Sequence, residues 1–260
     1  FKPKGQILGM ELSGVIEAIG TDVTKFEIGD QVIAGTGLKF GAYAEYKCMK
    51  SSDFIALKPS NMSYTEAATM PTGAINALHY IRKGNIQPGQ KVLINGAAGC
   101  FGTYAIQFAK LLGAEVTGVD RTDKLEILRD LGADHVIDYI QEAYIKNGES
   151  YDVILDVVGK DSVARAMKSL TNTGHYILAT PWVFQVLQGL WASLTSKRKF
   201  IFALAQENIE DLEYITKLIE SGKVEAVIDK TFPLKDMVDA HRYVESGDKI
   251  GHVVITVAHD

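Results

Sequence analysis

Three glycines, Gly96, Gly99 and Gly102, span the junction of an apolar run at residues 91–95 and a stretch at 101–112 with apolar residues at helical spacing. A turn that binds a pyrophosphate needs a bare backbone, close packing of helix on strand, and a helix N-terminus facing the anion. Glycines alone are weak evidence, because many loops contain them and the spacing is GxxGxxG rather than GxGxxG. The strand before and the helix after the triplet make the pattern specific, and together they predict a dinucleotide-binding turn.

The same alternation of short apolar runs and helical patterns continues along the middle of the chain. The predicted strands are residues 91–95, 115–119, 135–138, 153–158 and 175–180, and the predicted helices include 101–112 and 123–131. Strands that alternate with helices in this way favour a parallel sheet covered by helices on both faces. The sequence therefore predicts an α/β fold with a Rossmann doubly wound parallel sheet.

Asp120 ends the second predicted strand, about 20 residues beyond Gly99, where a dinucleotide-binding domain places the acid that binds the ribose. The alternative is that Asp120 caps the next helix, although Thr122 or Asp123 can take that role. A ribose-binding acid favours NAD(H) narrowly. Arg121 and Lys124 are the counter-evidence, since two mobile cations in an exposed pocket can pair with the 2′-phosphate of NADP(H). NAD(H) and NADP(H) both remain open.

The two ends of the chain have a different sequence pattern from the middle. Short β-branched runs separated by glycines, at residues 14–20, 26–33 and 41–46, indicate antiparallel strands of a small barrel. A helix over 65–82 follows, with Ser63 or Thr65 as its cap, and after a helix at 209–220 the chain ends in a strand at 253–257. We therefore expect a first domain at 1–72, the cofactor domain at 73–207, and a return to the first domain at 208–260.

Composition limits the classes of partner that this protein is expected to bind. The chain has 260 residues and a net charge of −5, with basic and acidic residues well mixed, which excludes a nucleic-acid surface. No apolar stretch approaches the ~20 residues that cross a bilayer, and the N-terminal residues lack the pattern of a secretory signal. We expect a cytoplasmic protein with a small-molecule substrate, and neither a membrane nor a nucleic acid as partner.

Several further motifs carry a resemblance to a known family. They are G-M-E-L-S-G at residues 9–14, Gly20, G-D-Q-V at 29–32, G-A-Y-A-E-Y at 41–46, Ala240-His241 and G-H-V-V at 251–254. With the glycine triplet they resemble the medium-chain dehydrogenase/reductase superfamily, most closely its zinc-free, quinone oxidoreductase-like branch. The resemblance implies a partial GroES-like β-barrel catalytic domain beside the Rossmann domain, a homodimer, and hydride transfer from NAD(P)H to a quinone, an activated alkene or a similar electrophilic carbonyl compound.

Two departures from the family pattern limit the site assignment. Zinc-dependent members have a histidine where this chain has Met10, and Cys48 and Cys100 form no metal-binding pair, so no metal is expected. Family members also have further strands and a catalytic-pocket segment before the Gly-x-Glu motif, whereas this chain begins almost at it. The catalytic residue is therefore unknown, and we interpret Tyr43 and Tyr46 as packing residues.

The resemblance also places residues around the cofactor. Gly99, Cys100 and Phe101 would line the pyrophosphate, and the strand end at 157–159 would pass the nicotinamide ribose. Asn76 would lie beside the nicotinamide, or is an ordinary polar residue of the linking helix. The predicted cofactor-binding residues are Asn76, Gly96, Gly99, Cys100, Phe101, Gly102, Asp120, Arg121, Lys124 and Val158. Residues 182–203 cover the acceptor pocket or form a subunit contact.

Two other functions remain as alternatives. One is a non-catalytic nucleotide-binding protein, in which the cofactor stabilises or senses without turnover. The other is a zinc-dependent alcohol dehydrogenase, which would need stoichiometric metal. Oxidation of the reduced cofactor by a quinone acceptor separates the reductase from the first, and metal content separates it from the second.

Overall fold

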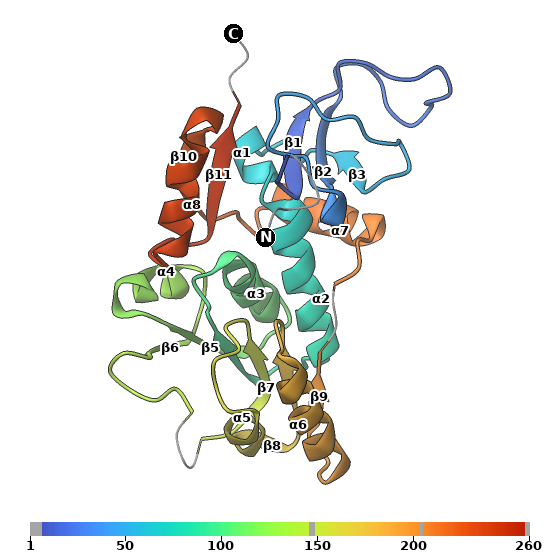
Figure 1. Ribbon diagram of the computed structural model, residues 1–260. Coiled ribbons are helices and arrows are strands. Elements are labelled where there is room, and N and C mark those ends of the chain that lie inside the picture. Colours follow the sequence, from blue (N-terminus) through green and yellow to red (C-terminus); the bar gives the residue numbers. More distant parts are fainter. Residues whose placement is uncertain (1–6, 146–148, 203–204, 258–260) are drawn as a thin grey trace. The chain divides into compact units, whose positions relative to one another are not determined.

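The computed structural model describes residues 7–145, 149–202 and 205–257 (Figure 1). The chain divides into two compact units, one made of Phe1–Ile75 with Glu207–Asp260 and the other of Asn76–Gln206. The chain thus leaves the first unit, builds the second, and returns to the first.

A six-stranded parallel sheet forms the centre of the second unit. Its strands are β4 (Lys91–Asn95), β5 (Glu115–Asp120), β6 (His135–Asp138), β7 (Tyr151–Asp156), β8 (Leu170–Leu178) and β9 (Lys199–Ile201). The order across the sheet is β6-β5-β4-β7-β8-β9, so the chain starts in the middle and works outward to each edge in turn. This is the strand order of the Rossmann fold, and the direction of winding reverses between β4 and β7. The predicted α/β fold is confirmed.

Helices precede the first of these strands or connect later ones. They are α2 (Ile75–Gly84), α3 (Cys100–Leu111), α4 (Leu125–Asp130), α5 (Val163–Lys168) and α6 (Val183–Leu194), with a 3-10 turn, η3 (Thr122–Lys124), before α4. Right-handed crossovers place the helices that follow β4 and β5 on one face of the sheet, and those that follow β7 and β8 on the other. The helix predicted over 123–131 is correct in place but is divided into η3 and α4.

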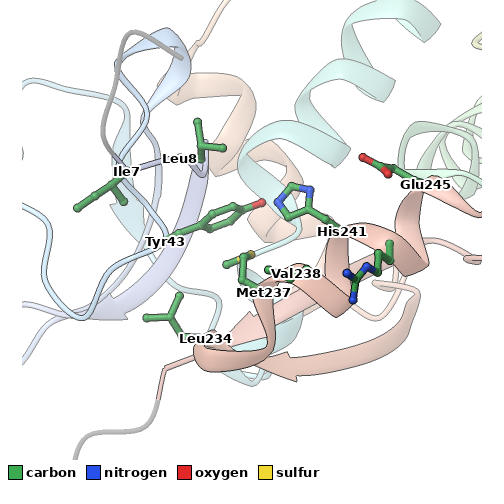
Figure 2. Close-up of a pocket in the computed structure, with 9 residues that line it drawn as sticks. Ile7, Leu8, Tyr43, Leu234, Met237, Val238, His241 and Glu245 are labelled. Atoms are coloured by element: carbon green, nitrogen blue, oxygen red, sulfur yellow. The ribbon is translucent and has the colours of Figure 1, made fainter. Parts of the chain in front are cut away.

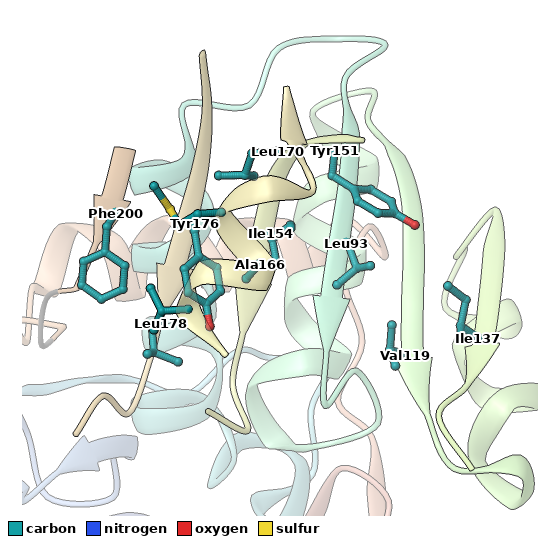
Figure 3. Packing of buried hydrophobic residues seen from close by; sticks show 12 residues of the cluster. Leu93, Val119, Ile137, Tyr151, Ile154, Ala166, Leu170, Tyr176, Leu178 and Phe200 are labelled. Carbon is teal, nitrogen blue, oxygen red and sulfur yellow. The ribbon is translucent and has the colours of Figure 1, made fainter. Parts of the chain in front are cut away.

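The core of this unit lies along the sheet. Leu93, Val119, Ile154 and Leu178 come from four different strands and pack with Tyr176, whose ring is fully buried (Figure 3). Parallel strands covered on both faces are apolar along their whole length. That explains why β4 and β7 contain the continuous apolar runs V-L-I and V-I-L rather than alternating residues.

The first unit contains two small sheets. β1 (Glu11–Val15), β2 (Gln31–Gly35) and β3 (Ile55–Leu57) pair antiparallel, and β10 (Ile228–Pro233) pairs parallel with β11 (His252–Thr256). The helical segments are η1 (Gly37–Lys39), α1 (Tyr64–Ala67), η2 (Met70–Ala74), α7 (Ile209–Glu220), η4 (Leu234–Asp236) and α8 (Met237–Glu245). A buried cluster of Phe26, Val32, Ala34 and Ile55 holds the antiparallel sheet together.

One predicted element of this unit is wrong, and a predicted helix that runs from this unit into the second is correct in place but divided. The strand expected at 41–46 is a series of bends, because the backbone N–H groups of Gly41 and Tyr43 both donate to the carbonyl of Leu8, at 3.1 and 2.9 Å. A strand ladder does not direct two such donors to one carbonyl. The helix expected over 65–82 begins as predicted, with a capping box between Ser63 and Glu66, but Pro71 follows at the start of η2 and divides it.

Candidate functional site

The glycine turn joins β4 to α3. Gly96 has a φ of 81°, a conformation that side-chain-bearing residues rarely adopt, and its N–H donates to the carbonyl of Val119 at 3.1 Å. The N–H of Ala97 donates to the same carbonyl, also at 3.1 Å. These two hydrogen bonds therefore hold the turn at the carboxyl end of β5.

The other two glycines bring the helix close to the turn. A Cβ added to Gly102 would lie 2.4 Å from the carbonyl oxygens of Gly96 and Ala97, so only glycine fits there. Gly99 is the N-cap residue of α3, and the cap makes no side-chain hydrogen bond. The first turn of α3 also lacks an acidic residue, so the positive end of the helix has no anionic side chain of its own. Such a helix end suits a phosphate.

Asp120 lies at the carboxyl end of β5, 9% exposed, and bridges the strand to the turn. Its Oδ2 accepts the N–H of Ala98 and its Oδ1 accepts the N–H of Arg121, both at 2.9 Å. The carboxylate does not cap α4, whose N-cap position is Lys124 and has no side-chain cap bond. Each carboxylate oxygen has further acceptor capacity, which ribose hydroxyls can use.

Arg121 and Lys124, the two cations beside Asp120, are less mobile and less exposed than expected. Arg121 forms a bidentate pair with Asp123, with Nε to Oδ1 at 2.7 Å and Nη2 to Oδ2 at 2.8 Å. The hydrogen bond from Arg121 lowers the pKa of Asp123 below its ordinary value. Lys124 is only 6% exposed. The expectation of two mobile, solvent-exposed cations is therefore wrong, because one is buried and the other is held by a carboxylate.

Asp156, at the end of β7, is a site residue that sequence reasoning missed. Its Oδ1 accepts the N–H groups of Val158 at 3.0 Å and Gly159 at 2.9 Å, and it also accepts Nδ2 of Asn95 at 2.9 Å. Its Oδ2 accepts the hydroxyl of Tyr176 at 2.9 Å. This buried carboxylate therefore determines the shape of the turn at 157–159. The sequence holds one indication of it, an acid that ends an apolar strand three residues before a glycine.

The hydrogen bonds extend from Asp156 to neighbouring elements. Asn95 also donates to the hydroxyl of Tyr144, which in turn donates to Asp161. Burial raises the pKa of Asp161 above its ordinary value, against the opposing effect of Arg165. Burial, together with Asp156, raises the pKa of Tyr176, so its phenol remains a donor. The ends of β4, β7 and β8 are thus held by one polar network.

The glycine turn, Asp120 and Asp156 all lie at the carboxyl ends of the central strands of the sheet. Asn95 pairs with Val119 on one side and with Asp156 on the other, so the carboxyl ends of β4, β5 and β7 are adjacent. A Cβ on Gly96 would lie 2.8 Å from Cγ2 of Val158, which places the two turns in contact. The glycine turn, Asp120 and the turn at 157–159 therefore surround the point where the winding reverses, the usual ligand crevice of such sheets.

The remaining predicted positions lie on helices or turns of this unit. Cys100 and Phe101 are half-buried in the first turn of α3, and Asn76 is half-buried near the start of α2. Val158 is exposed at the edge of the sheet. Most of the segment predicted over 182–203 is helix α6, and Ala203 lies outside the described residues.

A cavity of about 540 Å³ in the first unit was not predicted (Figure 2). It is lined by Ile7, Leu8, Tyr43, Leu234, Met237, Val238, His241, Arg242 and Glu245. The rings of Tyr43 and His241 meet edge to face, with centroids 6.0 Å apart, and the Tyr43 hydroxyl points toward the imidazole. Burial, with a smaller effect of Glu11, raises the pKa of Tyr43. Tyr43 is thus a protonated packing residue of this wall, whereas Tyr46 is exposed.

Residues 7–145, 149–202 and 205–257 contain no group of three or more His, Cys, Asp or Glu side chains placed to hold a metal ion. Over the same ranges, no helix has the length and apolar character needed to cross a bilayer.

Comparison with known proteins agrees with this geometry. Residues 131–255 match the model of a zinc-binding dehydrogenase family, and residues 1–60 match that of the alcohol dehydrogenase GroES-like domain. NAD(P)H oxidoreductase RTN4IP1, mitochondrial, from Bos taurus is 33% identical over 96% of this chain and 70% of its own length. A 2-methylene-furan-3-one reductase from Solanum lycopersicum is 33% identical over 97% of this chain and 64% of its own.

A solved structure is similar along most of the fold. The quinone oxidoreductase from Coxiella burnetii superposes with a TM-score of 0.88 and 31% sequence identity, covering 96% of this chain and 79% of that chain. This likeness includes both the parallel-sheet unit and the unit that flanks it in the sequence.

Proposed function

The chain belongs to the medium-chain dehydrogenase/reductase superfamily, in its zinc-free, quinone oxidoreductase-like branch, and we propose that it reduces an electrophilic acceptor with hydride from NAD(P)H. The acceptor is a quinone, an activated alkene or a similar electrophilic carbonyl compound. The names of the relatives support this class, because they include an NAD(P)H oxidoreductase, a 2-methylene-furan-3-one reductase and an NADPH-dependent alkenal/one oxidoreductase.

The observation that carries the proposal is the arrangement of two turns and one acid at the reversal point of the sheet. The uncapped end of α3, with Gly99, Cys100, Phe101 and Gly102 in and before its first turn, would hold the pyrophosphate. Asp120 would bind the adenosine ribose beside it. The turn at 157–159, shaped by Asp156, would pass the nicotinamide ribose.

The bound nicotinamide supplies the hydride, and the protein positions the ring and keeps water away from it. Met10 stands where zinc-dependent relatives have a histidine, so hydrogen bonds rather than a metal polarise the acceptor in this proposal. That favours acceptors that are already electrophilic over simple alcohols or ketones. Asn76, in the first turn of α2, is proposed to lie beside the nicotinamide.

The test is oxidation of NADH or NADPH by the purified chain in the presence of 1,2-naphthoquinone, followed through the loss of nicotinamide absorbance. We expect turnover in the parent, and slower turnover at the same subsaturating cofactor concentration in Gly99→Val. Binding of the reduced cofactor without any turnover, across quinone and alkenal acceptors, would support the non-catalytic alternative. One tightly held zinc per chain, with activity lost on its removal, would support an alcohol dehydrogenase instead.

The proposal also includes an oligomeric state and a cellular location. A homodimer follows from the family resemblance, and light scattering of the purified chain measures it. A cytoplasmic location stays a prediction, since the names of several relatives carry the words mitochondrial or chloroplastic.

A further inference from the structure

The turn at 157–159 is held by side chains of two different elements. Asp156, at the end of β7, accepts the N–H groups of Val158 and Gly159 at 3.0 and 2.9 Å. The carbonyl of Gly159 is held from α6, where Nε2 of Gln185 donates to it at 2.9 Å. Gly159 has a φ of 67°, in the left-handed region, and side chains satisfy both polar groups of its backbone.

Gln185 lies on the face of α6 that packs on the sheet. Its side chain is only 4% exposed, although glutamine is normally a surface residue. Its Oε1 accepts the N–H of Trp182 at 2.8 Å, so both ends of the amide are used, one by the start of the helix and the other by the turn. Farther along the same face, Gly189 and Ser193 contact Phe200 of β9.

The segment that joins β8 to α6 lies against the same turn. The N–H of Ala179 donates to the carbonyl of Asp156 at 3.0 Å, and the hydroxyl of Thr180 donates to the carbonyl of Val157 at 3.3 Å. A Cβ on Gly159 would lie 3.2 Å from the carbonyl oxygen of Thr180, so the two segments are in contact. The turn after β7 and the start of α6 are therefore parts of one hydrogen-bonded assembly.

We propose that Gln185 is a positioning residue for the nicotinamide end of the cofactor. The inference rests on the proposed function, in which the turn at 157–159 passes the nicotinamide ribose, and it extends that site to α6. Gln185 acts through Gly159 and not on the ligand itself. Without Gln185, Asp156 alone would hold Gly159, and ordering a looser turn would cost more entropy when the nicotinamide end binds.

The two ends of the cofactor separate this role from a general effect on stability. ADP has the adenosine and the pyrophosphate of the cofactor but lacks the nicotinamide and its ribose. It would use the end of α3 and Asp120, and would not reach the turn at 157–159. A residue that positions only this turn affects binding of the reduced cofactor and leaves ADP unchanged, whereas a residue that stabilises the whole unit affects both.

Gln185→Met is the variant that tests the proposal. It removes both hydrogen bonds of the amide and nearly keeps the volume and flexibility of the side chain. Calorimetric titration measures the dissociation constants of ADP and of the reduced cofactor, NADH or NADPH, that the parent binds more tightly. We expect the dissociation constant of the reduced cofactor to rise by about fivefold to tenfold, the range of one net hydrogen bond, and that of ADP to change by less than about twofold.

Two other variants calibrate this result. Ser193→Ala removes the acceptor of the Phe200 N–H on the same face of α6, so it should lower the thermal midpoint and leave both dissociation constants unchanged. Gly99→Val lies in the glycine turn and should weaken binding of both ligands. The thermal midpoint of each variant is measured in parallel.

Amide hydrogen exchange of the parent tests the same link without a substitution. Because Oε1 of Gln185 holds the N–H of Trp182, the reduced cofactor should slow exchange in peptides that span residues 182–186, and ADP should not. If Gln185→Met does not fold, exchange at 182–186 that is unchanged by the reduced cofactor overturns the proposal.

Three titration results would overturn the proposal, and each has a different meaning. Equal losses of affinity for ADP and the reduced cofactor in Gln185→Met would show a general structural role. Unchanged affinity for both ligands in a folded Gln185→Met would show that the turn does not need this residue. Failure of the parent to bind ADP, with or without the reduced cofactor, would remove the proposed cofactor site and this proposal with it.

Discussion

The carboxylate of Asp120 accepts the backbone N–H of Ala98 at 2.9 Å, so the acid at the end of β5 and the glycine turn after β4 form one structural unit. A ligand that binds the turn through its phosphates and the acid through its ribose meets two groups that are already fixed relative to one another. Pre-organised groups of this kind reduce the entropy lost on binding.

Gly99→Val should weaken cofactor binding. Its Cβ would lie 3.2 Å from the carbonyl oxygen of Gly96, a contact that requires a shift of a few tenths of an ångström, while the branched side chain fills the space over the end of α3. We expect an increase in the dissociation constant of about tenfold or more, equal to at least ~1.4 kcal/mol, with little change in thermal midpoint. Fluorescence titration of NADH measures it.

Two other glycines serve as controls for that variant. Gly14→Val adds the same side chain where nothing lies within 4 Å, and should change neither binding nor stability. Gly102→Ala forces a Cβ against two backbone oxygens and should lower the thermal midpoint, as overpacking by about 1–3 kcal/mol does. Unchanged NADH affinity in a folded Gly99→Val would contradict the site.

NADH should bind slightly more tightly than NADPH, because Asp120 is fixed near the ribose site while Arg121 is held by Asp123. Asp123→Asn should release Arg121 toward a 2′-phosphate and tighten NADPH binding up to about fivefold, the range of an exposed ion pair. NADH binding should not change. Dissociation constants for both cofactors at one stated ionic strength measure the effect.

Arg121→Ala/Asp123→Asn is the matching control. The gain in NADPH affinity expected for Asp123→Asn should be absent in this double variant. If the parent already binds NADPH more tightly, with a steep dependence on salt and a loss on Arg121→Ala, then the cations decide cofactor choice and the role given to Asp120 is wrong.

Asp156→Ala should weaken cofactor binding by loosening the turn at 157–159, since it removes the acceptor of two backbone N–H groups. Asp156→Asn should restore much of the affinity, because the amide oxygen still accepts those groups. Asp152→Ala is the control on the same strand. Asp152 accepts the N–H of Lys91 and the hydroxyl of Thr171 near the amino end of the sheet, so its loss should lower stability alone. Equal cofactor affinity in Asp156→Ala and Asp152→Ala would disprove the positioning role.

Stability should fall as the pH drops below about 6.5, in part through His252. Burial lowers the pKa of His252, against the opposing effect of Glu11, so the unfolded chain takes up a proton near pH 6.5 before the folded chain does. The unfolded state binds more protons below that pH, and the folded state loses at most about 1.4 kcal/mol per pH unit until its own pKa is reached.

His252→Gln should therefore flatten the dependence of the thermal midpoint on pH between about 6.5 and 5. Identical slopes in the parent and His252→Gln would mean that other groups take up the proton.

The part of the fold around the glycine turn was predictable because its causes are local. The apolar run at β4, the glycine spacing and the helical periodicity of α3 all lie within residues 91–112, and the structure confirms each of them. The resemblance to the superfamily is likewise confirmed by the comparisons.

The missed features depend on residues that are far apart in the sequence. Asp156 has its role because the topology brings Asn95 and Tyr176 to it, from 61 and 20 positions away. The burial of Lys124 depends on tertiary packing, which a count of charges does not reveal. The segment at 41–46 alternates like a strand, and only the position of Leu8 shows that its hydrogen bonds go elsewhere.

The division of the first unit into two stretches implies an order of folding during synthesis. Asn61 donates to the carbonyl of Ile219, and Ser60 to the carboxylate of Glu220, so this unit closes only after Asn76–Gln206 has left the ribosome. At roughly 5–20 residues per second, its last stretch follows several seconds later. The parallel sheet can therefore fold before residues 207–260 are available to complete the first unit.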